Sequence, residues 1–375
     1  MATFSRVACG FAHTMVLSRD GELHTCGRGN SGQLGHGTRQ HRDTMTALPY
    51  DLREARAVVA GFHHAAVLRA DGVVMLWGHN SNGQLGDGSA QDQLVPTLLG
   101  PPNFWCAKVA MVACGGRHTL LVTDAGLVFA FGLGENGRLG LGDNHARQVP
   151  AYIEPSFFHQ EKIAGIAAGA RHSGVVTTHG TVFMWGYGDH GSLGFPSSGD
   201  QLRPMRLLPG FCNACALYAG SLHTMVRTAT GQVWAWGGND YGQLGLGDTK
   251  KRSVPHRIEA LAHAKIREVA CGQFHTLAVD EDRVVWSWGR GDSGALGHGD
   301  AAGTLVPVCI PPHHFGGAKI TALGCGFRHS AAVSEDGALY TWGGAEYEVN
   351  VPSGLGHGTR DDILVPTKVV LFGSE

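Results

Sequence analysis

One pattern recurs seven times along this sequence and constrains its fold more than any other feature. Each copy carries a Gly-x-x-His element, then a Trp-Gly step and later a proline. The histidines are separated by 51, 54, 54, 51, 52 and 54 residues, and they are His13, His64, His118, His172, His223, His275 and His329. The prolines assigned to the copies are Pro49, Pro96, Pro150, Pro204, Pro255, Pro307 and Pro366. Regular copies of this length indicate one repeat architecture, because such copies pack mainly on their neighbours.

The third copy shows the secondary structure that each repeat predicts. Apolar runs of strand length cover residues 108–114, 118–123 and 127–131, and a fourth run follows Pro150. Asp124-Ala-Gly126 separates the second run from the third, and an Asp-Gly pair at that place in three other copies is a hairpin signal. No stretch shows a sustained helical period with caps.

These runs predict an all-β fold, a seven-bladed β-propeller of four-stranded antiparallel blades. The prediction treats residues 1–375 as a single propeller built of seven repeats of about 51–54 residues. Closure of the ring is expected to pair the strand near Val369 with the strand near Val7.

Composition and charge exclude several classes of protein. The formal net charge of −2 predicts no strong nucleic-acid binding, and no apolar run reaches the length of a membrane span. The first residues lack the apolar core of a signal peptide. Four of the nine cysteines share one repeat position, where alanine fills the other copies, so they are predicted to be small buried residues. An intracellular location, cytoplasmic or nuclear, follows from this usage of cysteine.

Three short motifs resemble functional sites and are interpreted as parts of the scaffold. Gly-x-Gly-x-x-Gly occurs four times without a following helix, so no dinucleotide cofactor is predicted. The repeat histidines lie one to a blade and cannot converge on a metal ion, so we expect each to hydrogen-bond the backbone. Cys212-x-x-Cys215 has no second pair to complete a metal site. No catalytic residue is predicted, because no set of nucleophile and base stands apart from the repeat.

The combined pattern resembles the repeat of the regulator of chromosome condensation family over essentially all of residues 4–371. The elements that carry the resemblance are Val-Ala-Cys-Gly-x-x-His-Thr, Trp-Gly-x-Gly-x-x-Gly-x-Leu-Gly and Val-Pro. The resemblance implies a seven-bladed propeller, in agreement with the repeat count.

Functional residues are expected where the copies differ. In an antiparallel meander the Gly-x-x-His loops and the long glycine-rich loops share one face. The copies six, seven, one and two present a phenylalanine in Gly-x-x-His, and copy seven also carries a longer loop with the segment Ala345–Pro352. The predicted partner site consists of Phe11, Phe62, Phe274, Phe327, Arg328, Glu346, Tyr347 and Glu348. Arg117 and Arg171 mark the opposite arc, and the glutamates favour a basic or mixed-charge partner.

Three functions follow from the resemblance. The family's plant UV-B photoreceptor uses tryptophans at the variable loop positions, where this sequence has none. The family's founder is a guanine-nucleotide exchange factor for the small GTPase Ran and uses a protruding wedge after a Trp-Gly step, a place comparable to that of the Ala345–Pro352 segment. The favoured interpretation is a non-enzymatic interaction propeller, whose partner would be a small GTPase or a protein of the ubiquitin pathway or the cilium.

Overall fold

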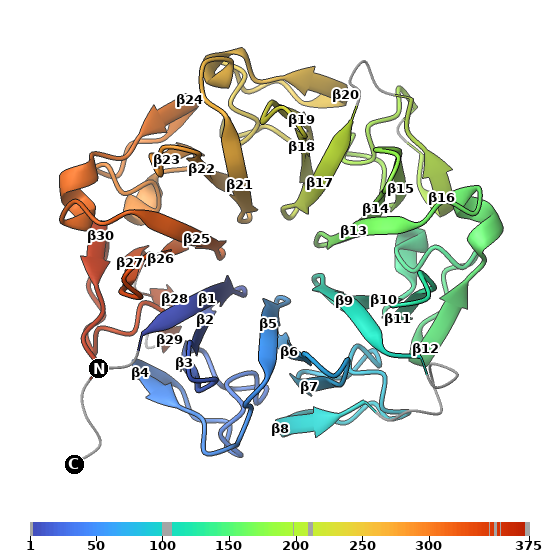
Figure 1. The fold of residues 1–375 in the computed structure, drawn as a ribbon, viewed down its shortest axis with the longest axis horizontal. Coiled ribbons are helices and arrows are strands. Elements are labelled where there is room, and N and C mark those ends of the chain that lie inside the picture. The colour runs from blue at the N-terminus through green and yellow to red at the C-terminus, as the bar shows by residue number, and fades with distance from the viewer. Residues whose placement is uncertain are drawn as a thin grey trace.

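Seven four-stranded antiparallel sheets are arranged in a ring around a central channel (Figure 1). The computed structural model describes residues 3–99, 107–197, 199–208, 213–344, 346–348, 351–352 and 354–371. Each sheet is one blade and is built from one repeat, so the predicted seven-bladed β-propeller is confirmed.

The blades share one strand order from the channel to the rim. The innermost strands are β1 (Phe4–Cys9), β5 (Ala55–Ala60), β9 (Val109–Cys114), β13 (Ile163–Ala168), β17 (Ala214–Ala219), β21 (Ile266–Cys271) and β25 (Ile320–Cys325). The second strands are β2 (His13–Ser18), β6 (His64–Arg69), β10 (His118–Thr123), β14 (His172–Thr177), β18 (His223–Thr228), β22 (His275–Asp280) and β26 (His329–Ser334).

The third strands are β3 (Leu23–Gly27), β7 (Val74–Gly78), β11 (Val128–Gly132), β15 (Val182–Gly186), β19 (Val233–Gly237), β23 (Val285–Gly289) and β27 (Leu339–Gly343). The outer strands are β4 (Arg42–Ala47), β8 (Gln93–Leu98), β12 (Arg147–Ile153), β16 (Gln201–Arg206), β20 (Arg252–Arg257), β24 (Thr304–Cys309) and β30 (Ile363–Lys368). Short 3-10 turns cover Glu135–Gly137, Pro155–Phe158, Glu259–Leu261, Asp292–Gly294 and Pro312–Phe315.

The hairpins between the second and third strands form as the Asp-Gly signals predict. In the first blade Ser18 N–H donates to the Glu22 carbonyl, so the loop has three residues and ends on Gly21. Gly21 has a φ of 85°, the left-handed conformation that such loops require at this place.

The outer strands start earlier in the sequence than expected. In six blades the repeat proline lies inside the outer strand, as Pro96 does in β8, and the strand does not begin after it. In the first blade Met45 takes this place in β4 and Pro49 follows the strand, so the assignment of Pro49 to the repeat is wrong. A proline suits these strands because an edge strand can lose one backbone donor.

Ring closure uses no exchange of strands, so the predicted pairing near Val369 and Val7 is wrong. Val7 pairs with Val16 of the same blade, and Val369 N–H donates to the Leu339 carbonyl. The first and seventh blades instead share a core cluster that contains Phe4 and Val369. The two ends of the described chain therefore meet through side-chain packing between complete blades.

A hydrogen bond between neighbouring blades explains the histidine of each repeat. We call the contact between two neighbouring blades a seam. In six of the seven seams the imidazole Nε2 lies 2.8–3.3 Å from a Ser or Thr hydroxyl on the second strand of the next blade, as in His64 to Thr119 at 3.0 Å. The Thr119 hydroxyl donates its proton to the Gln84 carbonyl at 2.8 Å, so it accepts the Nε2 proton of His64. The expectation that each imidazole bonds backbone is wrong, because the partner is a side chain of the next blade.

The glycine of Gly-x-x-His is required by the same contact. A Cβ at Gly61 would lie 2.4 Å from His64 Cε1 and 2.6 Å from the Gly115 carbonyl of the next blade. Real Cβ atoms do not approach other atoms so closely. The motif therefore describes an imidazole that lies over its own glycine, at the point where two blades touch.

The tryptophan of the Trp-Gly step belongs to this network too. Trp236 is fully buried, and its indole N–H donates to the Ser192 carbonyl of the preceding blade at 2.8 Å. The Thr224 hydroxyl donates to the same carbonyl at 2.8 Å. One loop carbonyl thus receives both a hydroxyl and an indole proton from the next blade.

One seam lacks the hydroxyl. Ala65 stands in the second blade where the other blades have Ser or Thr, and both ring nitrogens of the buried His13 have no hydrogen-bond partner among the described residues. A buried polar group without a partner costs stability. Trp77 still donates to the Gln33 carbonyl in this seam, at 3.0 Å.

We expect Ala65→Ser to stabilise the protein by about 0.5–1.5 kcal/mol, because the new hydroxyl can accept from His13 and donate to the Gln33 carbonyl. Denaturant unfolding followed by circular dichroism measures the change. Ala66→Ser is the matched control. Both alanines are fully buried in apolar clusters, but only Ala65 stands at the position where other blades have the Ser or Thr that pairs with the histidine, so Ala66→Ser should lose stability. An unchanged or lowered stability of Ala65→Ser would contradict the proposed pairing.

The buried histidines also predict acid sensitivity. Burial lowers the pKa of His64 to about 3 and that of His172 to about 4, from the usual value of about 6.5. The histidines of the unfolded chain bind protons near pH 6.5, whereas those buried in the folded chain do not. Protonation therefore takes nothing from the free energy of unfolding above that pH. This free energy should fall by at most about 1.4 kcal/mol per pH unit for each neutral histidine as the pH drops toward about 3 or 4.

Melting temperatures between about pH 7.5 and about pH 4.5 test this acid slope. His172→Gln should make the slope shallower. His145→Gln should leave it unchanged, because the His145 ring is 82% exposed. A melting temperature that stays constant over this range would contradict the neutral state of the seam histidines.

Candidate interaction face

The loops between strands divide into two faces of the ring, and the repeat variation falls on one of them. The Gly-x-x-His loops join the first and second strands, and the long glycine-rich loops join the third and fourth. The two loop types touch, since Arg28 N–H donates to the Ala12 carbonyl at 2.7 Å. We call this side the Gly-x-x-His face, and the Asp-Gly turns lie on the opposite face.

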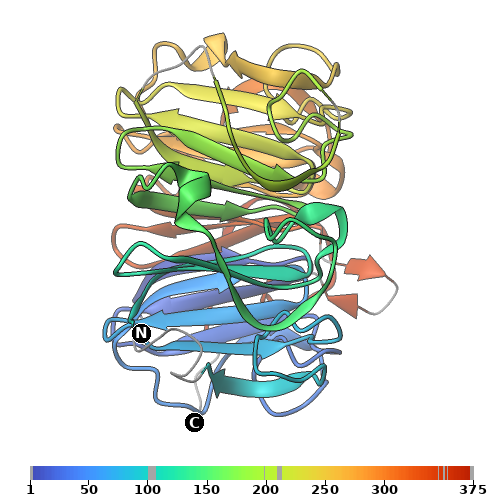
Figure 2. The same cartoon turned by 90° about the vertical axis from the view of Figure 1, so that its right-hand side faces the viewer.

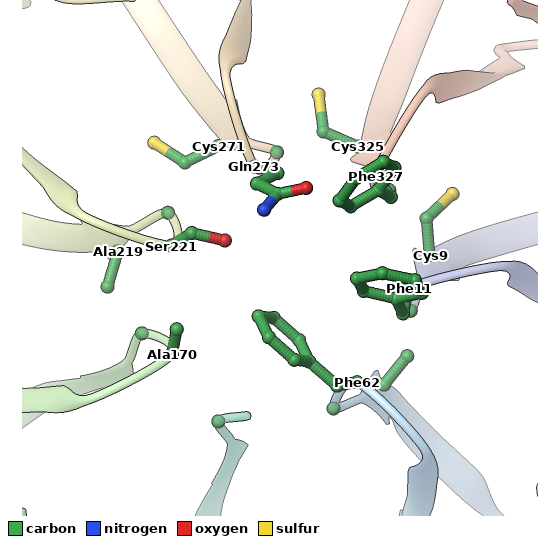
Figure 3. Close-up of a pocket in the computed structure, with 18 of the residues that line it drawn as sticks. Cys9, Phe11, Phe62, Ala170, Ala219, Ser221, Cys271, Gln273, Cys325 and Phe327 are labelled. Carbon is green, nitrogen blue, oxygen red and sulfur yellow. The ribbon is translucent and has the colours of Figure 1, made fainter. Parts of the chain in front are cut away.

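The first variable residue of the Gly-x-x-His loop lines the channel mouth in six of the seven blades. Figure 3 shows Phe11, Phe62 and Phe327 together on one side of the mouth, with Ala170 and Ser221 across from them. The ring centroids of Phe11 and Phe327 are 4.3 Å apart, and those of Phe11 and Phe62 are 5.5 Å apart. The three rings are half-buried, so they pack on one another and still meet solvent.

Backbone hydrogen bonds hold this arc in place. Phe327 N–H donates to the Phe11 carbonyl at 3.1 Å, and Phe11 N–H donates to the Phe62 carbonyl at 3.2 Å. The hollow between the rings and the small residues has a volume of about 80 Å³. Pockets for drug-sized ligands measure roughly 300–1,000 Å³, so the hollow suits part of one side chain rather than a whole cofactor.

Phe274 lies apart from the other three phenylalanines, contrary to their grouping by sequence. It is the second variable residue of its loop, and Gln273 lines the channel in its place. Its ring is 4.8 Å from that of Tyr241 and 6.3 Å from that of Phe327. The Arg290 guanidinium lies 4.9 Å from the Tyr241 ring centroid and 5.6 Å from that of Phe274. Phe274 thus joins the arc at its edge, over the long loop of the preceding blade.

This surface also includes Tyr241, Arg290 and His63, which the sequence does not predict as site residues. His63 is the second variable residue of its loop, and its ring lies 5.3 Å from that of Phe11. Burial, reinforced by the charges of Arg28, His79 and Arg117, lowers the pKa of His63 to about 4. A comparison of the second variable position and of the long loops, copy by copy, would have selected these residues.

The insertion of the seventh blade forms a small hairpin. β28 (Glu346–Glu348) pairs with β29 (Val351–Pro352), and Figure 2 shows the hairpin projecting from the ring. The side chains of Glu346, Tyr347 and Glu348 lie outside the described atoms, so their role stays a prediction. Arg328 is described, and its guanidinium lies 5.7 Å from the Phe327 ring centroid.

The motifs interpreted as scaffold have steric explanations. A Cβ at Gly134, the middle glycine of one Gly-x-Gly-x-x-Gly run, would lie 2.0 Å from the His145 carbonyl on the returning loop. Cys9, Cys114, Cys271 and Cys325 line the channel, and burial raises the pKa of the Cys9 thiol to about 12. Cys212 lies outside the described residues. Within the described chain, no helix is long and apolar enough to cross a membrane.

Characterised proteins similar to this chain differ widely in their named functions. The ultraviolet-B receptor UVR8 of Arabidopsis thaliana is 33% identical over 342 residues, which cover 90% of this chain and 76% of the receptor. The mitochondrial RCC1 domain-containing protein RUG3 of the same plant is 31% identical and covers 88% of this chain and 79% of its own length. Human E3 ubiquitin-protein ligase HERC2 is 32% identical over 95% of this chain, which spans only 7% of the ligase.

Solved structures share the fold at lower identity. Human WBSCR16 superposes with a TM-score of 0.82 at 24% identity, covering 93% of this chain and 94% of its own. Yeast RCC1 (Prp20), solved bound to Kap60, superposes with a TM-score of 0.81 at 23% identity, covering 93% and 84%. The family model of the RCC1-like domain matches residues 1–211 and 108–375. The chain belongs to the RCC1-like domain family.

Proposed function

We propose that the chain is a non-enzymatic interaction propeller that binds another protein on its Gly-x-x-His face. The observation that carries the proposal is the aromatic arc at the channel mouth, which runs from Tyr241 through Phe274, Phe327 and Phe11 to Phe62. Aromatic residues and arginine are enriched among residues that dominate binding energy. A continuous aromatic group that solvent still reaches is therefore a good candidate for anchoring a partner.

Related proteins support a range of partners. HERC2 is named as a ubiquitin-protein ligase, and the yeast relative Prp20p has a structure reported with its binding to Gsp1p and histones. We propose an intracellular partner, either a small GTPase or a protein of the ubiquitin pathway or the cilium. The photoreceptor function is not proposed, because Trp77, Trp185, Trp236, Trp288 and Trp342 are buried inside the blades rather than grouped at the mouth.

Replacing two aromatic anchors should weaken partner binding. We expect Phe62→Ala and Phe327→Ala each to cost about 2 kcal/mol of binding free energy, because each removes a packed ring from the arc. Affinity capture from cells, followed by titration of the identified partner with purified variants, measures the loss.

Tyr50→Ala provides the matched control for this test. Tyr50 is an aromatic residue that is 37% exposed, more than the half-buried Phe62 and Phe327, and it follows β4 toward the opposite face. Melting curves show that the variants fold. Normal partner binding by folded Phe62→Ala and Phe327→Ala proteins would mean that these rings only fill the channel mouth.

Nucleotide exchange on a Ran-type GTPase is the second candidate function. The observation that favours it is the β28–β29 hairpin, which projects from the seventh blade after a Trp-Gly step. We expect no acceleration of nucleotide release when purified protein is added to a Ran-type GTPase loaded with a fluorescent nucleotide. Acceleration that disappears when residues 345–352 are replaced by a short glycine loop would establish exchange and displace the first proposal.

A further inference from the structure

Two exposed arginines lie in the Gly-x-x-His loops of the third and fourth blades, which carry no phenylalanine. Arg117 and Arg171 occupy the second variable positions of the third and fourth blades. Each follows a small residue in the chain, Gly116 and Ala170 respectively. Within the described chain neither guanidinium has a carboxylate in ion-pair range, although Arg171 lies 5.3 Å from the Tyr187 ring centroid. These are exposed positive charges that the described chain does not neutralise.

A third arginine, Arg138, lies near both of them and is buried. The Arg138 side chain is 4% exposed, and it donates to the carbonyls of Glu135 at 2.8 Å and Ala170 at 3.4 Å. Its nearest carboxylate, that of Glu135, is 3.9 Å away and 68% exposed. Burial, opposed by Glu135 and aided by the charges of Arg171 and Arg117, lowers the Arg138 pKa to about 10, so the group stays cationic at neutral pH.

The hollow at the mouth has phenylalanines on one side and small residues on the other. Phe11, Phe62 and Phe327 line the first side, and Ala170, which precedes Arg171 in the chain, lines the second (Figure 3). A ligand that leaves the hollow over Ala170 would therefore meet exposed positive charge outside the mouth and aromatic rings inside it. Both features together favour a ligand that carries negative charge and an apolar side chain.

We propose that the partner presents an extended acidic segment, whose carboxylates pair with Arg117 and Arg171 while one apolar side chain enters the hollow beside the phenylalanines. This inference rests on the proposed function, since it assigns the partner's chemistry at the same face. A guanidinium offers paired N–H donors that match both oxygens of a carboxylate. The small residues at 116 and 170 leave the backbone of such a segment room to approach.

A nucleic acid fits this surface less well than an acidic peptide. Binding to a phosphate backbone depends on many basic residues along a track. Here Glu135 stands beside the arginine group, and Arg290 on the other arc is already paired with Asp292 at 2.5 Å. Two exposed guanidiniums beside an apolar hollow suit a few carboxylates around one apolar side chain.

The test uses the whole chain and a fluorescent peptide of alternating Glu and Gly residues around one central Leu. Fluorescence anisotropy should show binding that weakens as salt is added, because exposed charges are screened. Arg117→Gln with Arg171→Gln should reduce the affinity at least tenfold and flatten the salt dependence. Lys108→Gln with Lys162→Gln is the control, since it removes the same charge from exposed lysines at the opposite ends of the same two blades.

The outcomes separate this inference from the proposed function. If the double arginine variant binds the peptide normally while Phe62→Ala with Phe327→Ala abolishes binding, the aromatic site is supported and the acidic partner is contradicted. If only the double arginine variant loses binding, the acidic partner is supported and the phenylalanines are not anchors. An absence of peptide binding at low salt, tighter binding of a single-stranded oligonucleotide, or self-association of the chain that depends on both arginines would each overturn the inference.

Discussion

The rest of the ring depends on one pair of hydrogen bonds between neighbouring blades. A Ser or Thr hydroxyl of one blade accepts a proton from the imidazole of the preceding blade and donates its own proton to a loop carbonyl of that preceding blade. In the seam between the third and fourth blades the Ser173 hydroxyl lies 2.8 Å from both His118 Nε2 and the Arg138 carbonyl. Trp185 donates to the same carbonyl at 3.0 Å. Each of these groups bonds a group in the neighbouring copy, and for this reason the histidine, the hydroxyl, the tryptophan and the loop recur together. Repeats that are not stable alone therefore stabilise one another and fold as one cooperative unit.

The seam between the last and first blades uses the same positions with different residues. Cys26 replaces the tryptophan, and its thiol lies 3.2 Å from the Gly354 carbonyl. A Cβ at Gly354 would lie 3.0 Å from the His13 backbone, so the seventh blade's loop comes unusually near the first blade. At the rim Arg360 pairs with Asp43 at 3.2 Å. Closer backbone packing and polar contacts thus accompany the missing indole, and the ring closes without a shared strand.

The sequence was sufficient to predict the number of blades and the hairpins, because both follow from a period and from local turn chemistry. It was misleading where equivalent positions had to be aligned across copies. In the first copy the repeat position holds Met45, so the nearest proline, Pro49, falls outside the outer strand. Phe274 was grouped with Phe11, although the two occupy different variable positions and only one of these faces the channel. Tyr241 and Arg290 join the surface through contacts between blades, which no spacing within one copy reveals.

The network beneath the mouth explains why its residues can differ from blade to blade. Each first variable residue follows a glycine whose geometry is fixed by the imidazole over it, and the backbone there bonds to the next blade. These bonds use main-chain atoms, so Phe11, Ser221 and Gln273 can hold the same place without altering a seam. Side chains at the mouth can therefore change with little effect on the stability of the ring. The difference around the mouth, aromatic on one arc and small on the other, therefore informs on binding rather than on folding.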